Sequence, residues 1–393
     1  SLIFDADIIA DCVFGTGFHG DLSAETVEIF KMVSNSKAYK FACDIPSGIN
    51  CLTGVVSKGT ISCDKTITFH GLKLGAIFNN SKGFCGDISI SDIGIPSQSQ
   101  KYCDFNITHA DESYPALVLP KRDIGGHKGT FGKLLAICGS NEYRGAGLLS
   151  ISSAIRSGVG IVELFSPRDV INGMWANAPE AIYTETDDLT AHELTNLIIE
   201  KSKKATAILI GCGISCNSFT KELVKNLVIK SPVPIIIDAD GINSIIENIN
   251  VLMDTKAQVI LTPHPAELSR LCGVSISESI ENRLELAIQL SKKYGVTVIA
   301  KGAGTFISDS NGKDVFLTTY GNTSLSKGGS GDILSGIVSS LVAQGTTPKD
   351  ACVCGSIILG KVAELLSETM SERGIVGTDI IKKLPYVFKN LNI

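Results

Sequence analysis

Short apolar runs alternate along the chain with longer segments in which apolar residues recur at helical spacing. This alternation is typical of a parallel sheet with crossover helices, so we predict an α/β fold. The predicted strands cover residues 8–14, 40–44, 65–69, 87–90, 133–138, 160–165, 205–211, 234–238, 258–261 and 297–300. The longest helical patterns cover residues 278–293, 330–343, 348–367 and 378–389, and a shorter one covers residues 24–33.

A polar, aperiodic stretch from residue 97 to about residue 111 separates two α/β units. We therefore predict a smaller domain at residues 1–108 and a larger one at residues 109–393. The sequence opens at Ser1, without an initiator Met and directly before a strand-like stretch, so we expect it to lack part of its N-terminal domain. It shows no signal peptide and no apolar run that would span a bilayer, so we predict a cytoplasmic protein without a membrane partner.

Composition narrows the class of protein further. Hydrophobic residues make up 44% of the chain and charged residues 19%, which fits well-buried α/β layers rather than disorder. The net charge of -5 argues against a nucleic-acid partner, because such proteins normally carry a basic face. The 12 cysteines include no CxxC pair, so we expect reduced, mostly buried thiols rather than a zinc site.

The most informative segment is residues 327–336, in which glycines cluster directly before an apolar helical pattern. A helix that starts there presents unpaired backbone N–H groups and the positive end of its dipole, which suits a transferring phosphoryl group. Asp332 lies among these donors, where a carboxylate repels phosphate but is well placed to remove a proton from a neighbouring hydroxyl. The alternative is a Gly-rich turn with Asp332 near the N-cap of the helix.

Five other strand ends carry glycine or polar residues, namely 138–147, 211–213, 238–243, 261–267 and 301–305. Such residues are common in βα loops, but together they predict a ligand crevice at the carboxyl ends of the strands. His264 lies between two prolines, which favours an exposed, stiff loop over a core histidine. Lys301 would neutralise a phosphate or cap a surface, and Asp240 would orient a ribose or cap the following helix.

The order of these motifs closely resembles the ADP/ATP-dependent NAD(P)H-hydrate dehydratase family, a branch of the ribokinase-like fold. The resemblance covers about residues 112–393, through the segments 127–133, 138–140, 211–213, 238–240, 262–267, 301–305 and 328–332. It implies a central, mostly parallel sheet and a repair reaction on NADH or NADPH that carries a water molecule added across a ring double bond. The hydroxyl of the S epimer is phosphorylated, in most bacterial members by ADP, and phosphate is then eliminated to restore the cofactor.

The resemblance also implies roles for individual residues. Asp332 would act as the catalytic base. The implied anion hole for the transferring phosphoryl group consists of Gly328, Gly329, Ser330 and Gly331. The residues implied to bind ADP or ATP are Lys301, Gly302, Ala303, Gly304, Thr305 and Gly331. Those implied to bind the hydrate are Ala146, Gly213, His264 and Asp332. We expect Mg²⁺ on the phosphates.

The smaller unit is similar to the NAD(P)H-hydrate epimerase family through Asp11 and residues 14–17, 44–48, 53–54 and 73–75. The fusion of the two units resembles the bifunctional nicotinamide nucleotide repair enzymes of bacteria. The similarity implies that Asp11 and Ser47 bind a potassium ion and that Asp44 contacts the substrate and acts as acid and base. The implied substrate-phosphate loop consists of Gly15, Thr16, Gly17, Phe18, His19, Gly20 and Asp21.

The family's upstream NGGD loop is missing from this sequence, so we expect the epimerase-like unit to be an incomplete, inactive one. Two other functions remain open for the larger unit. One is a ribokinase-like kinase of a vitamin precursor, hydroxymethylpyrimidine or hydroxyethylthiazole, and the other is a non-catalytic nucleotide-binding scaffold. Members of the dehydratase family are often oligomeric, which makes a homo-oligomer a further expectation.

Overall fold

The computed structural model describes residues 2–77, 81–96, 98–99 and 106–393. The chain divides into two compact units near residue 105. Both units are α/β, as the alternating apolar pattern predicted.

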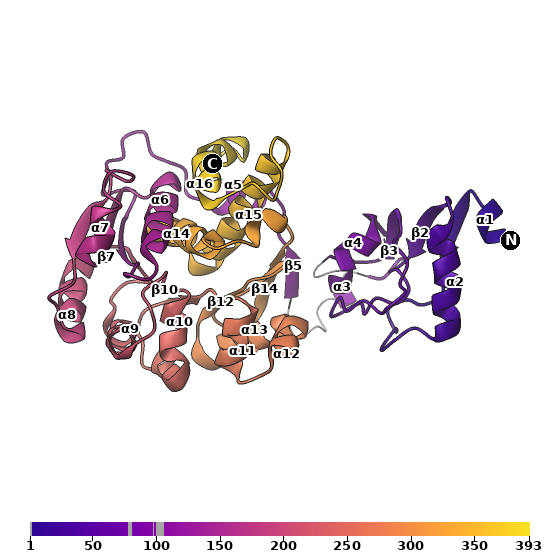
Figure 1. Ribbon diagram of the computed structural model, residues 1–393, viewed down its shortest axis with the longest axis horizontal. Helices are drawn as coiled ribbons and strands as arrows, with labels where there is room; N and C mark the ends of the chain where they lie inside the picture. Colours follow the sequence, from indigo (N-terminus) through magenta and orange to yellow (C-terminus); the bar gives the residue numbers. More distant parts are fainter. Residues whose placement is uncertain (1, 78–80, 97, 100–105) are drawn as a thin grey trace. The chain divides into compact units, whose positions relative to one another are not determined.

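The N-terminal unit contains a four-stranded parallel sheet in the order β1-β2-β3-β4 (Figure 1). Its strands are β1 (Ile8–Asp11), β2 (Tyr39–Cys43), β3 (Lys65–Phe69) and β4 (Asp87–Ser91). Its helices are α1 (Leu2–Asp5), α2 (Ala24–Asn35), α3 (Leu74–Ile77) and α4 (Lys82–Cys85). The predicted strand at 8–14 is too long, because Val13 and Phe14 donate their amide N–H groups to Asp11 and Ser47 instead of to a strand.

The larger unit contains a ten-stranded sheet in the order β5-β14-β13-β12-β11-β10-β9-β6-β7-β8. The strands are β5 (Asn106–His109), β6 (Lys133–Ile137), β7 (Ile161–Ser166), β8 (Ile182–Glu185), β9 (Ala207–Ile210), β10 (Ile235–Ile237), β11 (Val259–Leu261), β12 (Thr297–Ala300), β13 (Thr305–Ser308) and β14 (Asp314–Thr318). Neighbouring strands are parallel except that β13 runs antiparallel to both β12 and β14.

Helices cover both faces of this sheet (Figure 1). The helices on one face are α5 (Tyr114–Val118), α6 (Arg144–Arg156), α14 (Ser330–Ala343), α15 (Pro348–Ser367) and α16 (Gly377–Asn390). Those on the other include α9 (Ser218–Lys230), α10 (Asp240–Ile245), α11 (Pro265–Cys272) and α13 (Arg283–Tyr294). The remaining helices are α7 (Arg168–Asn172), α8 (Ala191–Ser202) and α12 (Ile276–Glu281), with 3₁₀ segments at Ile246–Met253 and Thr323–Leu325.

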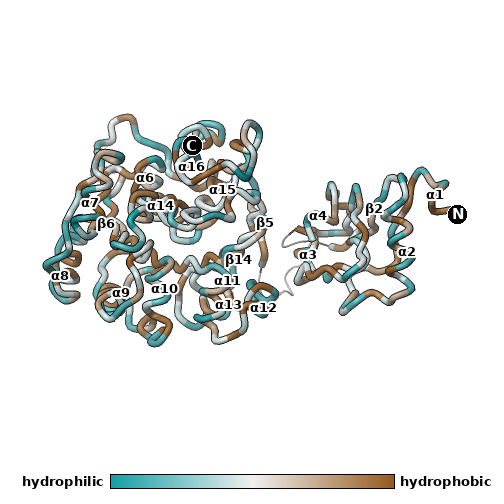
Figure 2. The backbone as a smooth tube through the Cα atoms, viewed as in Figure 1, coloured by the Kyte–Doolittle hydropathy of each residue, from teal (hydrophilic) through white to brown (hydrophobic). Residues whose placement is uncertain are grey.

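Burial explains which helical pattern was easiest to predict. From Ile333 to Ala343 every residue of α14 is buried, because this helix packs between the sheet, α6 and α15. The outer helices alternate between hydrophobic and hydrophilic colours as successive residues face the core and then solvent (Figure 2). The predicted bounds of α14 and α15 agree with the structure.

Three predictions about secondary structure were wrong. The stretch described as aperiodic contains β5, and the polar edge strand β8 has no clear period-two pattern, so neither was predicted. Strands β13 and β14 were not predicted either. The single helix expected at 278–293 is interrupted at Asn282, which ends α12 and precedes α13. Residues 301–305 are not a βα loop, because they lead from β12 directly into the antiparallel strand β13.

Candidate active site

The candidate site of the larger unit lies where the strand order reverses. From β6 the chain continues outward to β7 and β8, and it then returns to β9 on the other side of β6. Such a reversal leaves a crevice at the carboxyl ends of the two central strands. Here the two strand-end loops are joined by a hydrogen bond of 2.8 Å from the Gly139 amide to the Cys212 carbonyl.

The predicted anion hole forms the N-terminus of α14. Gly329 has a φ of 94°, so the backbone conformation favours glycine, and a Cβ atom there would also lie 2.5 Å from Cδ1 of Leu149 and displace that methyl group. The following residues begin the helix, and its first N–H groups have no partner within the helix. Lys327 points away from them and donates three hydrogen bonds to the carbonyls of Glu372, Arg373 and Ile375.

Lys301 reaches this N-terminus from the end of β12. A Cβ atom on Gly331 would lie 3.5 Å from the Lys301 ammonium and 3.7 Å from a carboxylate oxygen of Asp238. The structure thus brings together Lys301 and Gly331, both predicted to bind the nucleotide, from segments that are distant in sequence. Gly302, Ala303 and Gly304 form the turn that follows Lys301, and Thr305 begins β13.

Asp238, at the end of β10, is the hub of the polar network. Its buried carboxylate accepts hydrogen bonds from Thr262 (2.5 Å), Ser335 (2.7 Å) and Lys301 (2.9 Å). Burial alone would raise the pKa of Asp238, but the charge of Lys301 and these hydrogen bonds outweigh it and lower the pKa. Asp238 is therefore an ionised group that holds the Lys301 ammonium in place.

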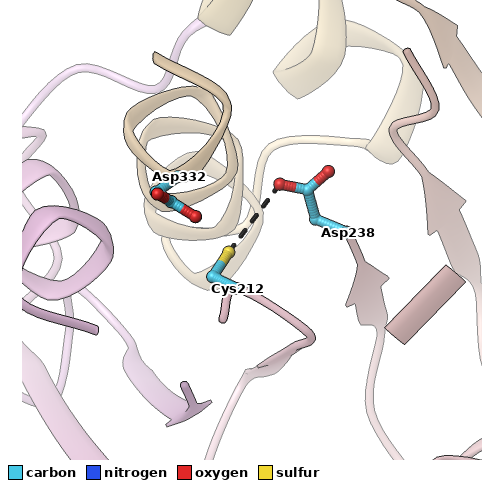
Figure 3. A group of neighbouring side chains, drawn as sticks. All are labelled: Cys212, Asp238 and Asp332. Carbon is cyan, nitrogen blue, oxygen red and sulfur yellow. Dashed lines mark hydrogen bonds between the residues drawn. The ribbon is translucent and has the colours of Figure 1, made fainter. Parts of the chain in front are cut away.

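The pKa of Asp332 is shifted in the opposite direction to that of Asp238, although the two carboxylates lie close together (Figure 3). Burial and then the negative charge of Asp238 raise the pKa of Asp332 to about 7. A carboxylate with this pKa accepts a proton near neutral pH much more readily than an ordinary aspartate does.

Cys212 completes the group in Figure 3, and its thiol lies 3.7 Å from Asp238. Ligand atoms of Cys212, Asp238 and Asp332 lie within 4.8 Å of one another, so a metal ion is geometrically conceivable. The neighbouring thiol of Cys138 and burial raise the pKa of Cys212 well above its ordinary value, however. Because Cys212 stays protonated and Asp238 is already paired with Lys301, the group is better suited to handling protons than to binding a metal.

His264 is the N-cap of α11. Its Nδ1 accepts hydrogen bonds from the amides of Ala266 (3.1 Å) and Glu267 (3.3 Å). Its Nε2 lies 3.2 Å from Oε1 of Glu267, so the proton of the neutral ring is on Nε2. Burial and then the charge of Lys301 lower the pKa of His264, which keeps the ring neutral. About half of its side chain is exposed, so the ring still offers a face to a ligand.

Ala146 and Gly213, both predicted to bind the hydrate, lie against each other. A Cβ atom on Gly213 would come within 2.6 Å of the Cβ of Ala146, and the φ of Gly213 is 66°. Beside them a cavity of 330 Å³ opens between the ends of β6, β7 and β9, and its polar lining includes Ser140, Asn141 and Ser215. Small residues and an open pocket with both polar and apolar lining residues leave room for a ligand at this end of the sheet.

In the N-terminal unit the predicted cation ligands also meet. Asp11 is buried at the end of β1, and its carboxylate accepts hydrogen bonds from the hydroxyl (2.6 Å) and the amide (2.7 Å) of Ser47. The same hydroxyl lies 3.2 Å from the carbonyl oxygen of Phe14. The structure thus groups a carboxylate, a hydroxyl and a carbonyl, which are oxygen ligands that suit a hard cation.

Asp44 follows β2 with a φ of 74°, an uncommon conformation for an aspartate. Its carboxylate forms an ion pair of 2.6 Å with Lys73 and accepts a hydrogen bond of 3.1 Å from the Phe69 amide. A Cβ atom on Gly15 would lie 3.9 Å from Asp44, so the predicted phosphate loop approaches this carboxylate. Lys73 was visible in the sequence only as part of a motif, and its pairing with Asp44 required the tertiary structure.

The rest of the predicted phosphate loop has mixed surroundings. The side chain of Phe18 is buried in the core of the unit, so only its backbone is available to a ligand. Asp21 accepts a hydrogen bond of 3.3 Å from Ser57, and His19 lies 3.4 Å from the side-chain amide of Asn50. The other predicted members of the loop, Thr16, Gly17 and Gly20, are partly or largely exposed.

Comparison with known proteins decides the family. A family model described as NAD(P)H-hydrate dehydratase matches residues 134–386. The chain belongs to the NAD(P)H-hydrate dehydratase family. A second model, described as the YjeF-related protein N-terminus, matches residues 1–75.

Relatives of this dehydratase family match the chain across both units. The bifunctional NAD(P)H-hydrate repair enzyme Nnr of Moorella thermoacetica is 31% identical over 390 residues, which cover 98% of this chain and 73% of that protein. The enzyme of the same name from Escherichia coli is 30% identical over 383 residues, covering 96% of this chain and 71% of that protein. The predicted resemblance to bifunctional repair enzymes is thereby confirmed.

A solved structure of the same dehydratase family confirms the ribokinase-like fold. The ADP/ATP-dependent NAD(P)H-hydrate dehydratase from Bacillus subtilis, co-crystallised with ATP/Mg²⁺, is 29% identical with a TM-score of 0.62. The match covers 73% of this chain and 99% of that one. Within the described residues, no helix combines the length and the apolar character needed to cross a membrane.

Proposed function

We propose that this chain converts (S)-NAD(P)H hydrate to NAD(P)H at the expense of ADP, which leaves AMP and phosphate. The observation that carries the proposal is the placement of Asp332. Its carboxyl group, with a pKa of about 7, lies at the N-terminus of α14 beside Gly331 and Lys301. A proton acceptor within a phosphate-binding helix N-terminus suits phosphoryl transfer to a hydroxyl group.

Each neighbouring group has a part in the first step. Asp332 takes the proton of the hydrate's hydroxyl as that oxygen attacks the β-phosphorus of ADP. The amides of residues 328–331 and the ammonium of Lys301 stabilise the negative charge on the transferring phosphoryl group. Asp238 keeps Lys301 in position and also keeps Asp332 basic.

Phosphorylation turns the hydroxyl into a good leaving group, and loss of phosphate together with a proton from the neighbouring ring carbon restores the ring double bond. The proposed hydrate-binding residues are Ala146, Gly213, His264 and Asp332, with the cavity beside Ser140 and Ser215 open to the rest of the dinucleotide. The proposed nucleotide-binding residues are Lys301, Gly302, Ala303, Gly304, Thr305 and Gly331. We propose that the nucleotide enters as its magnesium complex, which the ATP/Mg²⁺ in the Bacillus subtilis relative supports.

For the N-terminal unit, residues 1–108, we propose an epimerase-like site without activity of its own in this chain, and for residues 109–393 the dehydratase domain. Relatives named as bifunctional repair enzymes match both units, which supports the kinship of this site with an epimerase. Asp44 would act as acid and base on the hydrate. Asp11 and Ser47 would bind a potassium ion. The oxygen set of Asp11, Ser47 and Phe14 fits such an ion, which would fix the loop next to the substrate.

The experiment that tests the dehydratase proposal follows the return of NADH absorbance from a mixture of R and S NADH hydrate. The protein is supplied with Mg²⁺ and either ADP or ATP. Recovery of the S fraction faster than the spontaneous rate is the expected result. Recovery of both fractions would show epimerase activity as well. A stable phosphorylated product without NADH would overturn the proposal in favour of a vitamin-precursor kinase.

A further inference from the structure

Two cysteines of the N-terminal unit lie side by side at the ends of adjacent strands. Strands β1 and β2 are parallel, and Asp11 is paired with Ala42 in the last register position. One residue further, Cys12 therefore stands opposite Cys43, and their side chains lie on the same face of the sheet. Their sulfur atoms are 3.2 Å apart.

This arrangement is close to that of a disulfide. Opposite residues on adjacent strands are separated by about 4.8 Å, the spacing of strands in a sheet. That spacing falls within the Cα–Cα range of roughly 4.4–6.8 Å found in disulfides. The sulfur atoms need to approach by only about 1 Å to reach the bond length of about 2.05 Å.

Accessibility distinguishes this pair from Cys138 and Cys212, the cysteine pair near Asp332. Cys12 is exposed and Cys43 is half-buried, so a dissolved oxidant reaches the pair. Cys138 and Cys212 also lie close together, but both are buried and closed to such an oxidant. Cys51 lies in the same unit, and its thiol instead contacts the carbonyl of Thr16 at 3.2 Å.

We propose that Cys12 and Cys43 are a reversible oxidation site that forms an intramolecular disulfide with low-molecular-weight disulfides such as oxidised glutathione. Disulfides at exposed positions are the ones that small thiols reduce most easily, so this bond is expected to open and close with the thiol balance of its surroundings. The proposal concerns the thiols alone and does not depend on the dehydratase or epimerase activity.

The reaction balances as two successive thiol–disulfide exchanges. The exposed Cys12, as its thiolate, attacks one sulfur of oxidised glutathione, forming a mixed disulfide and releasing one glutathione thiolate. Cys43 then gives up its proton and attacks the Cys12 sulfur, which displaces the second glutathione. The cysteine pair loses two electrons, and oxidised glutathione gains them and becomes two molecules of reduced glutathione.

The position of the bond links the two groups proposed to act in this unit. Cys12 directly follows Asp11, and Cys43 directly precedes Asp44. A disulfide would therefore fasten the backbone that carries the proposed cation ligand to the backbone that carries the proposed acid and base. The larger unit contains neither cysteine, so we expect its dehydration of NADH hydrate to be unchanged by the bond.

The test uses the full chain in buffers of varied oxidised to reduced glutathione ratio. Exchange is stopped with acid, remaining thiols are alkylated, and the protein is digested with trypsin and analysed by mass spectrometry. Trypsin places Cys12 on the peptide of residues 1–31 and Cys43 on that of residues 41–58. The expected product is a cross-link between these peptides that is lighter by two hydrogen atoms, with both thiols lost at the same glutathione ratio.

The second peptide also contains Cys51, which supplies a matched control. Cys51→Ser should form the cross-link as the unmodified chain does. In Cys43→Ser the resolving thiol is missing, so Cys12 should accumulate as a stable mixed disulfide with glutathione. The proposal is overturned if the unmodified chain itself yields that mixed disulfide with Cys43 still alkylated. It is equally overturned if Cys51→Ser abolishes the cross-link, or if both thiols stay alkylated at every ratio.

Discussion

Replacing Asp332 by Asn should stabilise the larger unit while it abolishes the proposed reaction. Burial and the charge of Asp238 raise the pKa of Asp332 to about 7 from the ordinary 3.8. The folded state therefore binds a proton that the unfolded state has already lost between these two values. Stability contributed by this group is fully present below pH 3.8 and is lost as the pH rises to about 7. Asn resembles the protonated acid, so it should remove this loss.

The size of the effect follows from the same shift. One pKa unit corresponds to about 1.4 kcal/mol, so the whole interval is worth at most about 4 kcal/mol. Between about pH 5.5 and about pH 8 only the part below the folded pKa contributes, which is about 2 kcal/mol. The gain in free energy of unfolding caused by Asp332→Asn should thus be about 2 kcal/mol larger at the higher pH.

Trp175 makes the measurement specific, because it is the only tryptophan of the chain and lies in the larger unit. Its fluorescence in urea gives the free energy of unfolding at both pH values. Asp188→Asn, at an exposed aspartate, is the matched control and should change the free energy by less than about 0.5 kcal/mol at either pH. Turnover should fall by at least about 100-fold in Asp332→Asn alone. An equal gain at both pH values, or a loss of stability at the higher one, would refute the reasoning.

Three further substitutions test the surroundings of this carboxylate. Lys301→Met leaves Asp238 buried without its charge partner, so it should cost about 3–5 kcal/mol of unfolding free energy in the same urea assay. It should also raise the KM for ADP. An unchanged KM would show that Lys301 does not bind the nucleotide. Gly329→Ala places a side chain at a φ of 94° and 2.5 Å from Leu149, so it should lower the free energy of unfolding by at least about 1–2 kcal/mol and lower kcat. Full activity would contradict the proposed anion hole at the N-terminus of α14. His264→Ala removes the cap of α11 and should cost about 0.5–2 kcal/mol, while steady-state kinetics should show KM rising more for the hydrate than for ADP. Equal changes in the two KM values would limit His264 to its structural role.

The pattern of apolar residues predicted the parts of the fold that depend on local chemistry. Buried parallel strands and helices such as α14 leave long apolar runs, and glycine is needed where the chain enters α14 at a φ of 94°. Edge strands were missed because β5 and β8 are short and partly polar, and they gain their conformation from pairing with a neighbour.

The sequence by itself determined the fold class, the family and the segments that carry the chemistry. Glycine, aspartate and lysine at strand ends and helix starts are local requirements, and they are visible wherever they occur. Only the tertiary structure decided how these segments cooperate. It brings Asp238, Lys301 and Asp332 together from two strand ends and a helix, where burial and neighbouring charge hold one carboxylate ionised and raise the pKa of the other to about 7. The pairing of Cys12 with Cys43 likewise depends on strand register. Distances and desolvation arise from the packing of remote segments, so no local pattern of residues specifies them.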